Sequence, residues 1–169
     1  MGTFAPIPRV TRSVSSLLGL WIVVAVILAA CDITGGGWMA SASAQGGKAT
    51  FGFGLTCNGN GHLTGGWVYH DKAMGVDVGG TLTDSSGAPD GGPVACTAGS
   101  APGSGLWTLR YTAQHCRSNC VGVAVIDAED TGLTGPSKGD GLSIELSGGR
   151  YDGYSNARRL GGGNLTVTN

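Results

Sequence analysis

Charged residues are scarce in this chain, and they form no long block of one sign. Lysine and arginine number 10, and aspartate and glutamate 11, among 169 residues. A nucleic-acid-binding surface needs a basic stripe that neutralises phosphates. Arg158 and Arg159 form only an isolated pair, which is typical of a solvated turn. The acidic residues are too few for a disordered acidic tail. The sequence therefore predicts no nucleic-acid partner.

Several motifs that carry chemistry are also missing. There is no Gly-x-Ser-x-Gly nucleophile elbow. The glycine-rich segment 132–139 lacks the Gly-Lys-Ser/Thr of a phosphate-binding loop, and segment 59–64 lacks the third glycine of a dinucleotide fingerprint. His115, Cys116 and Cys120 lack the second close pair of ligands that a zinc site usually has. We therefore predict no catalytic residue and no cofactor.

Helical periodicity is absent after Ala30, whereas glycine is in large excess. Glycine accounts for 33 of the 169 residues, several times the usual share of about 7%. The glycines show no Gly-X-Y period, which excludes collagen. They lie between short stretches of alternating apolar and polar residues, the pattern of strands separated by turns and bulges. The chain after Ala30 is therefore predicted to be all-β.

The longest apolar run, residues 17–30, is too short to cross a bilayer as a helix, which takes about 20 residues. Arg9 and Arg12 precede it without any acidic residue, which is the pattern of a signal peptide. The run ends in Leu28-Ala-Ala-Cys31, which resembles the lipobox of bacterial lipoproteins. The resemblance implies cleavage before Cys31 and lipid on its sulfur. Two or more acyl chains anchor a protein stably to a membrane.

Two other interpretations of the N-terminus stay open. The chain could be a secreted protein cut after Ala42-Ser-Ala44, although this site lies a dozen residues beyond the apolar run. It could also keep an uncleaved anchor in which residues 13–16 lengthen the run. We favour the lipoprotein, facing the periplasm or the cell exterior.

This interpretation divides the chain into three parts. Residues 1–30 form the signal peptide, residues 31–47 the lipidated cysteine and a flexible stalk rich in Gly, Ser and Ala, and residues 48–169 a single β domain. Cleavage leaves 139 residues, with eight basic against eleven acidic residues and a net charge of −3. Trp38 is the one apolar landmark of the stalk, and we expect it to pack onto the domain.

Period-two alternation predicts seven or eight short strands, arranged as an antiparallel β-sandwich or a small barrel. Among the predicted inward stripes are Phe51, Phe53 and Leu55, and later Trp107 and Leu109. The predicted strands cover residues 49–57, 63–69, 74–82, 106–114, 121–128, 141–146, a short piece at 151–154, and 164–167.

The five cysteines are consistent with this scheme. Cys31 takes the lipid, and the other four can pair. In an up-and-down meander, Cys57 lies at the same end of the sheet as the loop that holds Cys96, while Cys116 and Cys120 flank a turn at the opposite end. We predict the disulfides Cys57–Cys96 and Cys116–Cys120, since an exported protein meets an oxidising environment.

One acidic segment is a candidate ion site. Asp127, Glu129 and Asp130, with Asp140 beyond a glycine-rich stretch, supply carboxylates from neighbouring β loops, and calcium takes six to eight oxygen ligands. The spacing does not match an EF-hand loop, and a solvated turn explains it as well. We retain calcium only as an alternative.

The chain from residue 35 to residue 167 resembles the β domains called post-COAP-1, which occur beside choice-of-anchor modules on exported bacterial proteins. The resemblance is carried by Gly35-Gly-Gly-Trp38, Gly47-Lys-Ala-Thr-Phe-Gly-Phe53, Gly61-His-Leu63, Tyr69-His-Asp71, Val125-Ile-Asp127, Gly139-Asp-Gly-Leu-Ser-Ile144 and Gly161-Gly-Gly-Asn-Leu165. It implies no catalytic residue and no established ligand. A single copy behind its own lipobox departs from the arrays expected of such domains.

These observations favour a membrane-tethered structural or binding module that meets a protein or glycan ligand without catalysis. The alternative is a small extracytoplasmic enzyme that acts on glycans through the carboxylates of residues 127–140, which requires two carboxyls at a defined separation in a cleft.

Overall fold

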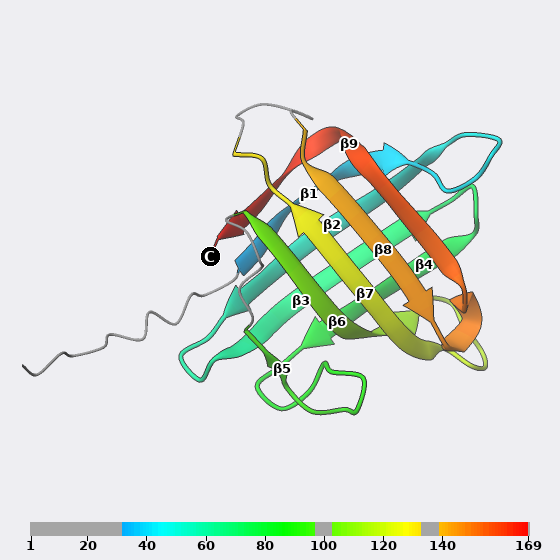
Figure 1. The fold of residues 1–169 in the computed structure, drawn as a ribbon. Coiled ribbons are helices and arrows are strands. Elements are labelled where there is room, and N and C mark those ends of the chain that lie inside the picture. The colour runs from blue at the N-terminus through cyan, green and yellow to red at the C-terminus, as the bar shows by residue number, and fades with distance from the viewer. Residues whose placement is uncertain (1–31, 97–102, 133–138, 169) are drawn as a thin grey trace, which may run out of the picture.

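The computed structural model describes residues 32–96, 103–132 and 139–168, which form a closed antiparallel barrel (Figure 1). The predicted signal peptide and Cys31 lie outside the described residues. The strands are β1 (Asp32–Ala40), β2 (Lys48–Cys57), β3 (His62–Asp71), β4 (Val76–Leu82), β5 (Val94–Ala95), β6 (Ser104–Ala113), β7 (Val121–Glu129), β8 (Gly141–Ser147) and β9 (Tyr154–Thr168). A single turn of 3-10 helix, η1 (Gly149–Tyr151), precedes β9.

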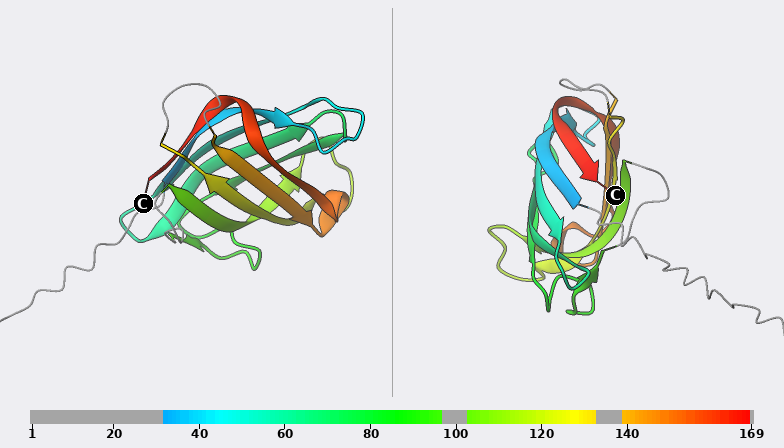
Figure 2. Two further views of the ribbon diagram at one scale, coloured as in Figure 1. Left: turned by 45° about the horizontal axis from the view of Figure 1, so that its top comes forward. Right: turned by 90° about the vertical axis from the view of Figure 1, so that its left-hand side faces the viewer.

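Eight strands close the barrel, so the fold is a barrel rather than a sandwich. Each strand pairs with the next along the chain, and β1 lies between β9 and β2; the two-residue β5 is an extra strand beside β3. The barrel is flattened when seen from its end (Figure 2). Its weakest seam joins β4 to β6 by only two residue pairs, against nine between β6 and β7. The loop after β4 supports this seam, because Arg110 N–H donates to the Gly87 carbonyl at 2.7 Å.

Side chains fill the interior of the barrel, as the alternation of the sequence predicts. The predicted inward stripes on β2 and β6 are confirmed, with Trp107 only 2% exposed and Leu109 fully buried. Met74 is an exception at 48% exposed, because it lies in the turn after β3, where its N–H donates to the Asp71 carbonyl. The largest fully buried side chains are Trp107, Tyr69, Tyr111, Ile33, Met39, Leu55, Leu63, Leu109, Ile126, Ile144 and Leu165.

The flexible stalk predicted for residues 31–47 is wrong for most of its length. Residues 32–40 form β1, which pairs over residues 33–40 with β2 on one side and over residues 32–39 with β9 on the other, with a register shift between Trp38 and Met39. Ile33 and Met39 point into the barrel and are fully buried. The single β domain therefore begins at residue 32 or before, not at residue 48.

The C-terminal prediction is wrong in a related way. Residues 151–154 and 164–167 are not two short strands, because Tyr151 ends η1, residues 152–153 form a turn, and one strand of 15 residues, β9, runs from Tyr154 through the second segment. The glycines of the two missed segments lie against each other. A Cβ on Gly37 would lie 2.2 Å from the Gly162 carbonyl oxygen, and a Cβ on Gly163 would lie 2.2 Å from that of Gly36. Such a close approach of two backbones leaves room only for glycine.

Trp38 packs onto the domain, as expected, but from within β1. Its indole ring covers Gly161 and Gly162 of β9, where a Cβ would lie 2.2 Å and 2.4 Å from the ring. Lys48 Nζ lies over the same ring, 3.9 Å from its centroid, which is the geometry of a cation–π contact. The three strands β9, β1 and β2 are thus bridged on the outside of the barrel.

The barrel has two ends of different character. We call the end where β1 begins and β9 finishes the terminal end; it also carries the turn 58–61 and the loop 83–93 (Figure 1). The far end carries the loops 41–47, 72–75, 114–120 and 148–153.

Candidate functional sites at the two ends of the barrel

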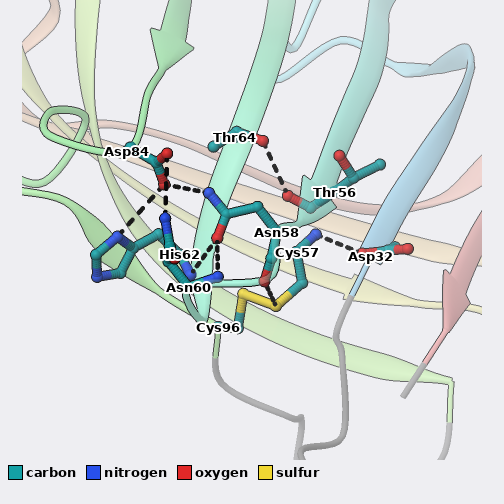
Figure 3. Close-up of a disulfide and its surroundings, with 9 residues drawn as sticks. All are labelled: Asp32, Thr56, Cys57, Asn58, Asn60, His62, Thr64, Asp84 and Cys96. Carbon is teal, nitrogen blue, oxygen red and sulfur yellow. Dashed lines mark hydrogen bonds and ion pairs between the residues drawn. A yellow bond between two sulfur atoms is a disulfide. The ribbon is translucent and has the colours of Figure 1, made fainter.

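A disulfide joins two segments of the terminal end (Figure 3). Cys57 is the last residue of β2, and Cys96 follows β5, which pairs with His62 and Leu63. Their Cα atoms are 5.9 Å apart. The predicted pairing is confirmed, because adjacent meander strands do bring these two cysteines to one end of the sheet.

Asp32 is held firmly in the same place. Its backbone pairs with Thr168, and its carboxylate accepts a hydrogen bond of 2.6 Å from the N–H of Cys57 (Figure 3). Charge-assisted bonds of this kind are stronger than neutral ones. The residue that directly follows Cys31 is therefore part of the barrel.

An exposed carboxylate that sequence reasoning did not select, Asp84, lies at the centre of a polar group beside this disulfide (Figure 3). It accepts hydrogen bonds from the side-chain amides of Asn58 and Asn60, and His62 Nδ1 lies 3.6 Å away. The Asn58 side-chain oxygen in turn accepts the N–H groups of Asn60 and His62. This arrangement shapes the turn 58–61, since Asn side chains commonly close turns in this way.

The carboxylates of the predicted ion site do not converge. Asp140 is 2% exposed and accepts hydrogen bonds from the N–H and hydroxyl of Thr131 and from the N–H of Leu165. Asp130 accepts the N–H groups of Gly132 and Val167. The two aspartates thus fasten the end of β7 and the start of β8 to β9. Across residues 32–96, 103–132 and 139–168, no group of three His, Cys, Asp or Glu side chains is placed to hold a metal ion.

The remaining two acidic residues lie in a shallow groove of about 330 Å³ on the outside of β7, β8 and β9. Glu129 is bound to Arg159, whose Nη1 lies 2.6 Å from the Glu129 carboxylate. Asp127 lines the same groove beside Arg158. The partner of Glu129 is thus a guanidinium rather than a second carboxyl, which does not favour glycosidase chemistry.

A buried polar network occupies the far end. The Asp71 side chain is fully buried and accepts hydrogen bonds from the Ser41 hydroxyl at 2.6 Å, the Ala42 N–H at 3.0 Å and the Tyr154 hydroxyl at 2.9 Å. The Met74 N–H adds a fourth donor at 3.3 Å. No side chain supplies a positive charge to this carboxylate within the part of the chain that the structure describes.

Two tyrosines extend the network across the barrel. Tyr154 uses its only proton toward Asp71, so Tyr69 donates in the 2.6 Å bond between the two hydroxyls. The amide of Asn156 donates to Tyr69 at 2.9 Å and to the Ala40 carbonyl at 3.0 Å. The hydrogen bonds therefore run from Asn156 on β9 to Tyr69 on β3, then to Tyr154 on β9, and end on the Asp71 carboxylate. Asn156 also binds the last residue of β1, so the network ties β1 to β3 and β9.

These contacts shift the pKa values of the network. Burial alone would raise the pKa of the Asp71 carboxyl, but the hydrogen bonds from Ser41, Ala42, Tyr154 and Met74 outweigh it and lower that pKa. Burial raises the pKa of the Tyr69 and Tyr154 hydroxyls. The network is thus a carboxylate surrounded by neutral donors, which suits a structural clamp.

A second disulfide closes the loop between β6 and β7. Cys116 and Cys120 are bonded with Cα atoms 5.5 Å apart, as predicted. The non-glycine residues with positive φ in the described chain both belong to this loop: His115 at 50° and Asn119 at 54°. Arg117 at its tip is exposed.

The three histidines do not lie together at one end of the barrel. His62 belongs to the terminal end, whereas His70 and His115 belong to the far end. His70 Nδ1 lies 2.7 Å from the Asp77 carboxylate on the outer face, while Asp71, the next residue, points inward. His70 and Asp71 therefore form no pair, because successive strand residues face opposite sides.

A shallow groove of about 700 Å³ lies on the outer face of β2, β3 and β4. Its floor is made of glycines, among them Gly52, Gly54, Gly66 and Gly79, and Val68 lies in it at 44% exposed. The described part of the groove has no charged side chain along its lining.

Comparison with known protein families, curated proteins and solved structures finds no match for this chain. The resemblance to post-COAP-1 domains therefore stays a prediction. Within the described ranges, no helix has the length and apolar character needed to cross a membrane. The two disulfides indicate an extracytoplasmic domain.

Proposed function

We propose that the protein is an extracytoplasmic structural or binding module, tethered to a membrane by lipid on Cys31. The observation that carries this proposal is the position of β1. A cut before Cys31 keeps this strand intact, and the strand closes the barrel by pairing with both β2 and β9.

The competing secretory cleavage after Ala44 is disfavoured on the same ground. It would remove β1 together with the buried Ile33 and Met39, and with Ser41, a hydrogen-bond donor to Asp71. The remaining barrel would have two unpaired strand edges next to an open core. Such edges promote aggregation.

The candidate carboxylates also support a module without catalysis. Asp130, Asp140 and Asp71 are hydrogen-bonded by backbone and hydroxyl donors that hold strands together. Glu129 is paired with Arg159. These four carboxylates thus serve the fold of the barrel, while Asp127 lines the outer groove of β7, β8 and β9.

The proposal is tested by producing the full chain in a bacterial host beside a Cys31→Ser variant. We expect the wild-type protein in the membrane fraction, with a mature N-terminus at a lipid-modified Cys31 by mass spectrometry. Cys31→Ser should be neither lipidated nor cut at residue 31. A wild-type protein that begins, unmodified, at Gln45 would refute the proposal, and so would an unmodified Met1.

A further inference from the structure

We propose that the terminal end of the barrel rests directly on the phospholipid headgroups, so that the far end is the surface presented away from the membrane. This inference rests on the proposed lipidation of Cys31 and adds the orientation of the domain. The partner of the terminal end is the headgroup layer of a bilayer.

The first argument is the absence of a spacer between the anchor and the fold. Cys31 is joined by one peptide bond to Asp32, whose backbone pairs with Thr168 and whose carboxylate binds the Cys57 N–H. Consecutive Cα atoms are about 3.8 Å apart. The anchor can therefore move away from the barrel by little more than that distance unless β1 unpairs.

The second argument is the direction of β1. The strand leaves the anchor and runs to the far end, and its pairing with β2 and β9 fixes its direction in the barrel. With strands of nine or ten residues, about 3.3 Å per residue and a tilt of roughly 40°, the two ends lie about 20–25 Å apart. Turning the far end toward the bilayer would require the start of β1 to leave its neighbours.

The third argument is the chemistry of the terminal end. Its turn and loop present Asn58, Asn60 and Asp84, which are polar, and Asp90 is also exposed there. Of the exposed large apolar side chains, Met74 and Val121 belong to the far end, whereas Leu106 is the third residue of β6 and lies toward the terminal end. The turn 58–61 and the loop 83–93 therefore suit hydrated headgroups rather than insertion into hydrocarbon.

This orientation exposes the disulfide-closed loop 114–120 to the surroundings. The loop holds His115 and Asn119 at positive φ, a conformation that is uncommon outside glycine but that Asn and His adopt more readily than most residues. It presents Arg117 at the end of the molecule opposite the anchor.

The experiment measures the distance of each end from the headgroups. The mature lipoprotein is placed in phosphatidylcholine vesicles that contain a lipid with a gadolinium chelate on its headgroup. A nitroxide is attached through an unnatural ketone residue in place of either Asn60, at the terminal end, or Gln45, at the far end. Both positions are exposed. The control carries a twelve-residue Gly/Ser spacer inserted between Cys31 and Asp32.

We expect the enhancement of nitroxide relaxation by the gadolinium lipid to be at least three times as large at position 60 as at position 45. The spacer should reduce the ratio of the two enhancements toward one. Equal relaxation at the two positions in vesicle-bound protein, or a faster rate at position 45, would overturn the orientation and leave the lipid anchor standing. Protein that does not bind the vesicles at all would instead overturn the anchor, and the orientation with it.

Discussion

The two disulfides are expected to contribute unequally to stability, because they close loops of very different length. Cys57 and Cys96 are separated by 39 positions, whereas Cys116 and Cys120 are separated by four. In the chain-entropy treatment, the loss of loop-closure entropy from the unfolded chain amounts to about 4 kcal/mol for the first bond and about 2 kcal/mol for the second. Removing both sulfurs of one bond at a time isolates each contribution without leaving a free thiol.

The variants are Cys57→Ala with Cys96→Ala, and Cys116→Ala with Cys120→Ala. Unfolding entropy of about 2.1 cal/mol/K per residue gives roughly 0.3 kcal/mol/K for the part of the chain after residue 31. The melting temperature should therefore fall by about 13 °C for the first variant and about 7 °C for the second. All four cysteines are partly buried, so the cavities left by alanine are comparable.

Calorimetry and urea unfolding at neutral pH measure both losses, with the wild-type protein in the absence of reductant as reference. Wild-type protein in excess dithiothreitol should lose about the sum of the two. If the short-loop variant loses as much stability as the long-loop variant, loop closure does not explain the effect of these disulfides.

Three further predictions concern the strands around β1. Asp71→Asn places an amide among four hydrogen-bond donors and should cost about 3 kcal/mol by urea unfolding; a loss below 1 kcal/mol would contradict the clamp. Because the folded-state pKa of Asp71 is lowered, its ionisation stabilises the wild type above the unfolded-state pKa of about 3.9. This stabilisation is lost as the pH falls below that value toward the folded-state pKa. Asp71→Asn should therefore reduce the fall of the unfolding free energy with decreasing pH. Gly37→Ala forces a Cβ against the backbone of β9 and should cost at least about 3 kcal/mol or prevent folding. The control Gly54→Ala, where a Cβ would have no neighbour nearer than 4.0 Å, should change stability by less than about 1 kcal/mol. Equal effects of the two substitutions would refute the close-approach argument. Lys48→Ala should cost about 0.5–1 kcal/mol through loss of the contact with Trp38, and Lys48→Arg should restore most of it.

Much of the barrel is predictable from alternation in the sequence. Wherever large apolar residues occupy every second position, as in Phe51 to Leu55 or Trp107 to Leu109, the strand and its inward face are confirmed. Both disulfides are confirmed as well, because an up-and-down order of strands decides which cysteines meet. The choice between sandwich and barrel is different, since it depends on whether β1 fills the gap between β9 and β2.

The candidate sites were harder to predict, for a physical reason. The sequence places Asp127, Glu129, Asp130 and Asp140 close together, yet two of them point to the outer groove and two accept hydrogen bonds from β9. Asp71 shows the reverse. In the sequence it resembles an ordinary turn residue beside a histidine. In the fold, Ser41 after β1 and Tyr154 of β9, which come from opposite ends of the chain, donate hydrogen bonds to it.

The two segments that alternation missed are a single structural feature. Gly35 to Gly37 fall in the predicted stalk and Gly161 to Gly163 between two predicted strands, because a run of glycines has no inward face to alternate. In the barrel these runs lie on neighbouring strands and meet at one pair, Gly37 opposite Gly163, with Gly36 opposite Asn164 and Trp38 opposite Gly162. The fragments Gly35-Gly-Gly-Trp38 and Gly161-Gly-Gly-Asn-Leu165 already carried the resemblance to a β domain, which was the signal that residue 35 belongs to the fold. Two glycine runs that are far apart in a sequence can therefore belong to neighbouring strands whose backbones lie in close contact. Where a tryptophan follows one run, its indole can cover the glycines of the other strand. It follows that any processing that leaves this protein folded has to leave β1 attached, and a cut directly before Cys31 does so with one residue to spare.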